Sequence, residues 1–489
     1  MRDLPDYRPG FHFAPARHWM NDPNGLVHHQ GRWHLFFQYN PQGNDWGNMS
    51  WGHASSPDLV RWTEHPVALP HRPGEEEIWS GCVVVDHHNT SGFGEPDGPP
   101  PLVAVHTSLY ADGRQAQSLA WSTDGGEAWT SYDGNPVLDR GSRHFRDPKV
   151  FWQPNGGYGR GEEAGHWVMV AVEAEARQVL LHRSDDLRSW TPLSSFGPID
   201  EAEHLWECPD LFPLPVDGEP GGTAWVLVVS VNPGAPAGGS GTRYVVGDFD
   251  GTTFTPRSDG PAYDEAWMDW GRDFYAAVTF DNAPGGRRVA IGWMSNWDYA
   301  AHVPTAPWRG SMAVPRELSL RRVDGVLRLH QQPVAELAAL EATAEPVAAQ
   351  PFDLTGERDL PGGARYRLDL VLEPVDAEQV GLDLLVGPGQ TTLLRYAPAT
   401  GVLGLDRRGS GEVGFSDVFP SHDTVTVPLR EGRLRLQVLV DRTSVEVFAQ
   451  DGAICLTQLV FAPDASTGAR LVSLGGRTRV VELVHRPLG

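Results

Sequence analysis

Cysteine is scarce in this sequence, which has only Cys82, Cys208 and Cys455 among its 489 residues. Their number is odd, they lie far apart, and none has the Cys-x-x-Cys or Cys/His spacing of a zinc site. The histidine pairs His28–His29 and His87–His88 lie in loop-like stretches and also lack metal-ligand spacing. The sequence therefore predicts neither a disulfide framework nor a metal site.

Positive charge is also in short supply. Lys and Arg total 39 against 63 Asp and Glu, which gives a formal net charge of −24 at pH 7. A surface of this sign repels phosphate backbones and anionic lipids, so nucleic acid and membranes are not expected as partners. A neutral sugar or oligosaccharide meets no such barrier. The oligomeric state is left open.

Long apolar runs are absent as well. No stretch approaches the roughly 18 apolar residues of a membrane span, and residues 1–13 lack the apolar region of a signal peptide. As written, the chain is expected to be soluble and cytoplasmic. If a leader had been removed, the same residues would belong to a secreted protein.

Helical periodicity is almost missing, and short alternating apolar runs such as 33–39, 166–174 and 224–231 take its place. Four segments repeat an acidic turn just before an aromatic residue, and these aromatics are Trp62, Trp129, Trp190 and Phe254. They follow one another at intervals of 67, 61 and 64 residues. An all-β unit of about 65 residues, repeated around an axis, predicts a β-propeller with about five blades.

The C-terminal part has a different pattern. One amphipathic window at 333–342 places Val334, Leu337 and Leu340 on one helical face, and strands with hairpin turns follow it. We therefore predict an all-β chain. Its expected parts are a five-bladed β-propeller at 1–330, a linker helix at 331–349 and a β-sandwich at 350–489.

Three acidic residues stand among aromatic, Pro and Cys neighbours instead of on a polar face. Asp22 lies in HWMNDPNGL, Asp147 in FRDP and Glu207 in WECPDLF. Each segment alone is typical of a turn, but turn chemistry does not explain large aromatics near all three. A buried carboxylate is costly unless it is paired or used, and two carboxyl groups in different surroundings are what glycoside hydrolysis requires.

These three segments resemble the signature motifs of glycoside hydrolase family 32, the invertases, levanases and inulinases. Similar stretches extend from about residue 12 to 460 and include FFQYNP, WGHASSPDLVRW, GRDFYAA, IGWMSNWDYA and DRTSVEVF. The resemblance implies a five-bladed β-propeller followed by a β-sandwich and the absence of a metal or organic cofactor. It also implies retaining, exo-acting release of terminal β-fructofuranosyl residues from levan, inulin and sucrose.

The resemblance assigns roles to individual residues. Asp22 matches the nucleophile, Glu207 the general acid/base and Asp147 the stabiliser of the transition state. The residues that match the fructose pocket are Asn21, Gln38, Trp46, Ser80, Arg146 and Trp297, the last preferred over Trp293.

Two finer expectations concern single neighbours in the sequence. Arg146 is adjacent to Asp147 and is expected to hold that carboxyl group ionised, which suits a residue that accepts hydrogen bonds from the sugar. The family commonly has Phe-Ser-Gly-Ser where this chain has Trp79-Ser80-Gly81-Cys82. We expect this change to alter the pocket wall and to leave the chemistry alone.

Two other functions remain open from the sequence. A fructosyltransferase would use the same carboxylates and exclude water from the second step. A non-catalytic fructan-binding propeller would have no need for both Asp22 and Glu207 in their complete motifs, so the hydrolase is favoured.

Overall fold

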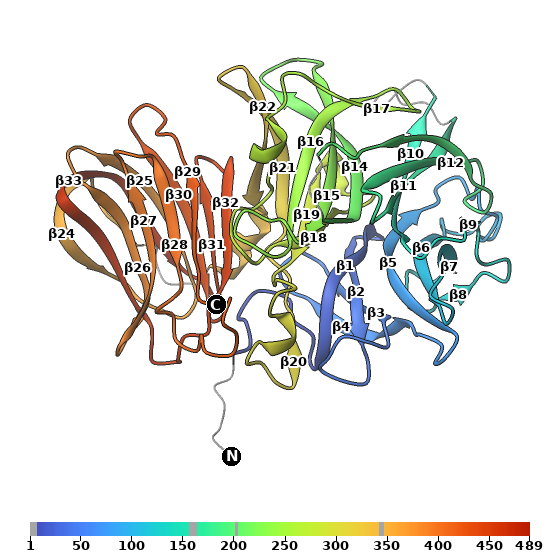
Figure 1. Ribbon diagram of the computed structural model, residues 1–489, viewed down its shortest axis with the longest axis horizontal. Helices are drawn as coiled ribbons and strands as arrows, with labels where there is room; N and C mark the ends of the chain where they lie inside the picture. Colours follow the sequence, from blue (N-terminus) through green and yellow to red (C-terminus); the bar gives the residue numbers. More distant parts are fainter. Residues whose placement is uncertain (1–6, 156–163, 201–203, 342–346) are drawn as a thin grey trace.

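The computed structural model describes residues 7–155, 164–200, 204–341 and 347–489. In this part of the chain, strands dominate and the helices are four short 3₁₀ segments. Figure 1 shows two bodies side by side, a ring of twisted sheets and a stack of two sheets. The predicted all-β fold, a five-bladed propeller followed by a sandwich, is confirmed.

Each propeller blade contains four main antiparallel strands, numbered outward from the axis. Their bounds are β1 (His18–His29), β2 (Arg32–Asn40), β3 (Ser50–Ser56) and β4 (Thr63–Leu69); β5 (Glu76–Val85), β6 (Leu102–Tyr110), β7 (Gln115–Ser122) and β8 (Thr130–Ser131), with β9 (Leu138–Asp139) beside β7; β10 (Phe145–Pro154), β11 (Gly165–Glu173), β12 (Gln178–Ser184) and β13 (Thr191–Phe196); β14 (Leu205–Asp217), β15 (Thr223–Asn232), β16 (Gly241–Phe249) and β17 (Phe254–Pro256); β18 (Tyr275–Thr279), β19 (Val289–Trp293), β21 (Arg316–Val323) and β22 (Val326–Pro333).

The first strands of the five blades close a ring around the axis. β1 contacts β5, β5 contacts β10, β10 contacts β14, β14 contacts β18, and β18 returns to β1. A short parallel pairing between β20 (Trp308–Arg309) and β1 also ties the last blade to the first. The inner strands are nearly continuous in buried residues, because they are covered by neighbours on both faces.

The repeated acidic turns occupy one equivalent place in four blades, between the third and fourth strands. In each turn a carboxylate oxygen accepts backbone N–H groups that follow it. Asp58 accepts from Arg61 at 2.8 Å, and Asp186 accepts from Ser189 at 2.7 Å. The spacing seen in the sequence therefore reflects one capped turn per blade.

The sandwich is formed by eleven strands. Their bounds are β23 (Val347–Ala348), β24 (Phe352–Leu360), β25 (Tyr366–Pro374), β26 (Gln379–Gly387), β27 (Gln390–Ala397), β28 (Val402–Asp406), β29 (His422–Thr426), β30 (Leu434–Asp441), β31 (Ser444–Ala449), β32 (Ile454–Leu459) and β33 (Gly468–Pro487). The 20-residue β33 belongs to both sheets, since residues 468–474 pair with β26 and residues 478–487 pair with β25. Alternate side chains, such as Leu368, Leu370 and Leu372, are buried between the sheets.

The linker is less helical than predicted. β22 runs to Pro333, and only Ala335–Leu340 form a helix, of 3₁₀ type. Val334, Leu337 and Leu340 are buried together, as expected. They are spaced by three residues, which suits the threefold repeat of a 3₁₀ turn. Residues 342–346 of the predicted linker lie outside the described part of the chain.

A buried charge cluster joins the propeller to the sandwich. His12 contacts Asp441 and Glu446 at 2.8 Å each, and Arg316 contacts Glu446 at 2.8 Å and Asp269 at 2.9 Å. The side chains of His12, Arg316 and Glu446 are fully buried. We call these five residues the interdomain cluster. Because every member comes from a different segment, the cluster fixes how the two bodies meet.

Candidate active site

A β-bulge interrupts each of the five inner strands near its N-terminal end. The register shifts lie between Met20 and Pro23, Ile78 and Gly81, Arg146 and Lys149, Glu207 and Asp210, and Tyr275 and Val278. Three bulge residues, Asp147, Cys208 and Ala276, have positive φ values of 61°, 45° and 54°. Bulges redirect side chains locally, and here they direct residues from all five blades toward the axis.

The two carboxylate oxygens of Asp22 differ in their hydrogen bonding. Its Oδ2 accepts a hydrogen bond from Ser80 Oγ at 2.7 Å, and Cys208 Sγ lies 3.6 Å away. Its buried Oδ1 has no hydrogen-bond partner among the described residues. Burial and the nearby charge of Glu207 raise the pKa of Asp22 to about 6, against the opposing hydrogen bonds. A fixed carboxylate with one unengaged oxygen is suited to nucleophilic attack.

Glu207 is held from two sides. Arg146 Nη2 donates to its Oε1 at 3.0 Å, and the Tyr275 hydroxyl donates to its Oε2. The side chain of Glu207 is 21% exposed, compared with 6% for Asp147. Glu207 is therefore more open to solvent than Asp147, which suits a residue that exchanges protons.

Asp147 is buried against the backbone of the fourth blade. Its Oδ2 accepts the Cys208 N–H at 3.0 Å, and its own N–H donates to Thr107 Oγ1 at 2.9 Å. The charge of Arg146 lowers the pKa of this carboxyl group, as expected, but burial is the larger influence. Burial raises the pKa of Asp147 to about 7, and Arg146 opposes this only in part because its Nε lies 3.8 Å away. The Arg146 guanidinium turns toward Glu207 instead.

Cys208 lies between the two aspartates. Its Sγ is 3.6 Å from Asp22 Oδ2 and 3.8 Å from Asp147 Oδ2. Burial, followed by the surrounding carboxylates, raises the pKa of this thiol well above its usual value. Cys208 is therefore a neutral spacer that keeps two acidic groups apart.

The predicted pocket residues divide into two groups. Ser80 donates to Asp22, Asn21 is buried directly before Asp22, and Arg146 donates to Glu207, so these three lie among the acids. Gln38 lies opposite the first bulge and donates to the Ile78 carbonyl at 3.1 Å. The structure brings these four residues together with the three acids.

The two predicted tryptophans differ in burial, and Trp297 packs against the cluster that contains Cys208 and Tyr275. Trp46 is 47% exposed and meets Trp79 edge-on at 5.9 Å between ring centroids. Trp297 is half-buried and stacks on Trp19 at 5.9 Å, whereas Trp293 is completely buried. Of the two candidates in that segment, Trp297 is therefore the one that a ligand can reach.

Cys82 does not belong to the pocket wall, contrary to expectation. Its Sγ accepts the Val150 N–H at 3.2 Å in the core between the second and third blades. In a regular strand, Ser80 and Cys82 would point to the same face. The bulge in β5 breaks this alternation, so Cys82 points into the core. Trp79, the other changed residue, contacts Trp46 at the rim.

Three supporting residues were not predicted. Tyr275 and Gln115 hold Glu207 and Arg146, and Thr107 holds Asp147. Tyr275 lies in the GRDFYAA stretch, which was noted only as part of the resemblance. Gln115 and Thr107 lie in ordinary strand patterns, so no local signal distinguishes them.

The axis is closed beneath the acids. A cavity of about 10 Å³, lined by Ser80, Asp147, Cys208 and Lys149, is the space left there, enough for about one water molecule. Below it, Lys149 Nζ lies 3.5 Å from Asp210 and donates to the Thr279 carbonyl. This Lys149–Asp210 pair forms a plug between the two ends of the propeller.

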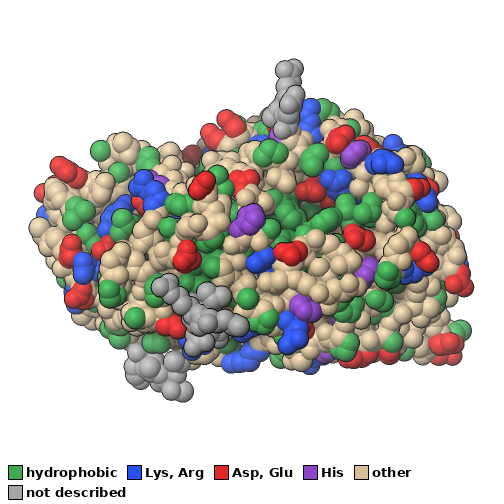
Figure 2. Space-filling view, turned by 60° about the horizontal axis from the view of Figure 1, so that its bottom comes forward, with side chains coloured by type: hydrophobic (Ala, Val, Ile, Leu, Met, Phe, Trp, Pro, Cys, Tyr) green, Lys and Arg blue, Asp and Glu red, His purple; other side chains and the backbone are tan. Residues whose placement is uncertain are grey.

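The described part of the chain lacks two features that would suggest other functions. It contains no group of three or more His, Cys, Asp and Glu side chains arranged to hold a metal ion. No helix there is long and apolar enough to cross a membrane. Figure 2 shows acidic and basic side chains interspersed over one face, so the negative charge does not form a single patch on that face.

A propeller whose inner strands bring paired carboxyl groups to one end of its axis defines a glycoside hydrolase. The chain belongs to glycosyl hydrolases family 32. The N-terminal domain of this family matches residues 12–333, and its C-terminal domain matches residues 336–486.

Named relatives support this assignment over nearly the whole chain. A levanase from Bacillus subtilis is 43% identical over 99% of this chain and 70% of the relative. An extracellular exo-inulinase from Aspergillus niger is 42% identical over 98% of this chain and 94% of the relative. The crystal structure of an exo-inulinase from Aspergillus awamori has a TM-score of 0.92 at 39% identity and covers 100% of this chain and 99% of that one. The non-catalytic alternative is therefore set aside.

Proposed function

We propose that this glycoside hydrolase releases terminal β-D-fructofuranosyl residues from fructans and sucrose by double displacement. The observation that carries the proposal is the pair of differently held carboxyl groups, Asp22 with one unengaged oxygen and Glu207 between Arg146 and Tyr275. The levanase and exo-inulinase relatives support levan and inulin as the substrate class.

The first step forms one bond and breaks another. Asp22 Oδ1 attacks the anomeric carbon of the terminal fructosyl unit, while Glu207 gives its proton to the departing glycosidic oxygen. Asp147 accepts hydrogen bonds from the sugar hydroxyls. These hydrogen bonds replace part of the hydration that its carboxyl group loses through burial. In the second step Glu207 takes a proton from water, and the resulting attack frees fructose and Asp22.

The remaining pocket residues have positioning roles. We assign Asn21, Gln38, Ser80 and Arg146 to the fructosyl unit that is cleaved, because they lie among the acids. The exposed Trp46 and the half-buried Trp297 are assigned to the sugar rings and the rim around it. A net charge of −24 supports neutral substrates over phosphorylated ones.

Two broader predictions stay open to test. The division into a propeller at 1–330 and a sandwich at 350–489 accords with the family domains that meet between residues 333 and 336. An extracellular location is supported by the name of the exo-inulinase relative, and locating the protein in its native cells by fractionation would test it.

The stereochemical outcome tests the mechanism without any mutation. Carboxyl groups that act by double displacement lie about 5–5.5 Å apart, which leaves no room for direct attack by water, and two inversions give net retention. NMR of sucrose or inulin digests within the first minutes should therefore show β-fructose first. Initial α-fructose would refute the assignment of Asp22 as nucleophile.

A further inference from the structure

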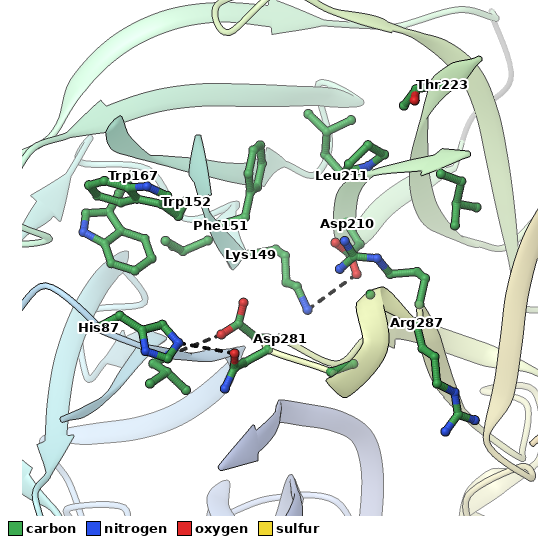
Figure 3. Close-up of a pocket in the computed structure, with 18 of the residues that line it drawn as sticks. His87, Lys149, Phe151, Trp152, Trp167, Asp210, Leu211, Thr223, Asp281 and Arg287 are labelled. Carbon is green, nitrogen blue, oxygen red and sulfur yellow. Dashed lines mark hydrogen bonds and ion pairs between the residues drawn. The ribbon is translucent and has the colours of Figure 1, made fainter. Parts of the chain in front are cut away.

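A second cavity lies toward the C-terminal ends of the inner strands, away from the N-terminal ends that carry Asp22, Asp147 and Glu207. Figure 3 shows residues that line it. Its volume is about 430 Å³, within the range of roughly 300–1,000 Å³ that is usual for small-molecule sites. It is lined by the far ends of β5, β10 and β14 and by the hairpin between β18 and β19. Lys149 and Asp210 line it from below, so the plug separates it from the active site.

One wall of this distal cavity is aromatic. Phe151 and Trp152 are half-buried, and Trp152 meets Trp167 edge-on at 5.0 Å between ring centroids. Trp167 is fixed in turn by a 2.8 Å hydrogen bond from its Nε1 to Thr90 Oγ1. Figure 3 shows Trp152 and Trp167 together on one side of the cavity. Rigid aromatic faces of this kind pack against the C–H faces of sugar rings at a small entropic cost.

The other walls are polar. His87 lies 3.3 Å from Asn282, and Asp281 accepts the Val85 N–H at 3.2 Å through one carboxylate oxygen. Figure 3 shows His87 and Asp281 below the aromatic wall, with Arg287 on the far side. This arrangement offers both hydrogen-bond donors and acceptors to a ligand that carries several hydroxyl groups.

The charges around the cavity are largely compensated. Lys149 pairs with Asp210, and Arg287 pairs with Glu336 at 2.5 Å and Glu317 at 2.8 Å. An anionic ligand would therefore meet no unpaired cluster of cations. A wholly apolar ligand would desolvate the ion pair at the base of the cavity, which is costly. A neutral ligand with hydroxyl groups and C–H faces fits both constraints.

We propose that the distal cavity is a second carbohydrate-binding site, which holds an internal segment of the fructan whose end enters the active site of the same or a neighbouring molecule. The identity of the sugar rests on the proposed function. Holding the polymer at a second point raises the effective concentration of its ends near the enzyme. The expected effect is confined to polymers, because sucrose engages one site at a time.

Kinetics of matched tryptophan variants test this site. Trp152→Ala removes the aromatic wall, and Trp190→Ala is the control, since Trp190 is a half-buried residue that packs against the same core cluster outside the cavity. We expect Trp152→Ala to raise KM for levan and inulin roughly fivefold or more, with kcat/KM for sucrose unchanged. Trp190→Ala should change neither. An equal change on sucrose and polymers, or wild-type KM for both polymers, would overturn the proposal.

A second variant adds a large side chain to the cavity instead of removing one from its wall. Thr223 is exposed at the rim (Figure 3), so Thr223→Trp adds bulk without removing a buried contact. In affinity electrophoresis, Glu207→Gln should be retarded by soluble levan, and the double variant with Thr223→Trp should be retarded less. Equal retardation of the two would refute the site. The two proposals can fail separately. If the wild type released no fructose from sucrose, inulin or levan, the proposed function would fail. The cavity would still be tested by comparing the retardation of the protein in gels that contain levan with its retardation in gels that contain starch.

Discussion

Two buried clusters of charge in this molecule contain similar groups, but they shift the pKa values of Asp22 and Glu446 in opposite directions. The shift is not uniform within the interdomain cluster, because burial raises the pKa of Asp269 there. In the active site, burial raises the pKa of Asp22 to about 6 and that of Asp147 to about 7. In the interdomain cluster, hydrogen bonds from His12 and then the charge of Arg316 overcome burial and lower the pKa of Glu446 to about 2. The pKa of His12 rises to about 9, because its bonds to Asp441 and Glu446 outweigh burial.

The difference lies in how many partners each acid has. Glu446 receives His12 and the Val314 N–H on one oxygen, and Arg316 on the other. Asp22 has a buried oxygen with no such partner among the described residues. A cluster whose acids are well paired stabilises an interface, while an underpaired one keeps reactive groups available at a cost in stability.

Removing the nucleophile should have the largest effect. Asp22→Asn keeps the shape of the side chain and removes its charge, so kcat on sucrose should fall by roughly 10³-fold or more. Thermal unfolding should show a Tm equal to or above that of the wild type, since a destabilised buried carboxylate is gone. A variant that kept more than about a tenth of the wild-type kcat would show that Asp22 is not the nucleophile.

Breaking the interdomain cluster should affect stability and not chemistry. Arg316→Met leaves Glu446 and Asp269 without their shared cation, which should cost about 3–5 kcal/mol of unfolding free energy. The control is Arg321→Met on the same strand, whose exposed pair with Asp217 contributes about 0–1 kcal/mol. Denaturant titration measures both. Equal losses in the two variants would contradict a special role for the buried cluster.

The two clusters should also respond to different pH ranges. The folded pKa of His12 is above its unfolded value of 6.5, so its stabilisation is complete below pH 6.5 and is lost as pH rises toward about 9. The raised pKa values of Asp22 and Asp147 give stabilisation that is present below about pH 4 and lost as pH rises through 6 to 7. His12→Gln should flatten the fall of Tm between pH 6.5 and 9 and leave the lower range unchanged. A wild-type slope in the upper range would refute this assignment.

The smallest predicted effect concerns a residue that orients Glu207. Tyr275→Phe removes the hydroxyl that bonds to Glu207 Oε2 and leaves Arg146 in place. Loss of one hydrogen bond to a charged group should lower kcat on sucrose about tenfold or somewhat more, with KM little changed. A substrate whose leaving group needs no protonation should be affected less in the first step. Equal losses on both substrates would indicate a purely structural role.

The sequence contained enough periodic information to predict the propeller and the three carboxylates. The turn repeat is local to each blade, and each acid lies in a short motif. The interdomain cluster had no such signal, because His12 and Asp441 are 429 residues apart and no period links them. The sequence pattern does not indicate the full length of β33 either, since Gly475 and Gly476 interrupt it where the strand passes between sheets.

The pKa of Asp147 shows a further limit of sequence reasoning. Arg146 is its neighbour along the chain, but only its Nε approaches Asp147, at 3.8 Å, and burial outweighs that attraction. The guanidinium instead reaches Glu207, 61 residues away. Adjacency in sequence therefore did not predict which acid would accept a hydrogen bond from the arginine.

The plug formed by Lys149 and Asp210 affects how substrate enters the active site and how product leaves it. Because the axis is closed below the acids, a chain end can enter only from the open side, and freed fructose can leave only by the same opening. Substrate entry and product exit then exclude each other in time. Fructose should accordingly behave as a competitive inhibitor. The enzyme must also release the shortened chain, or allow it to withdraw from the pocket, before each new cleavage.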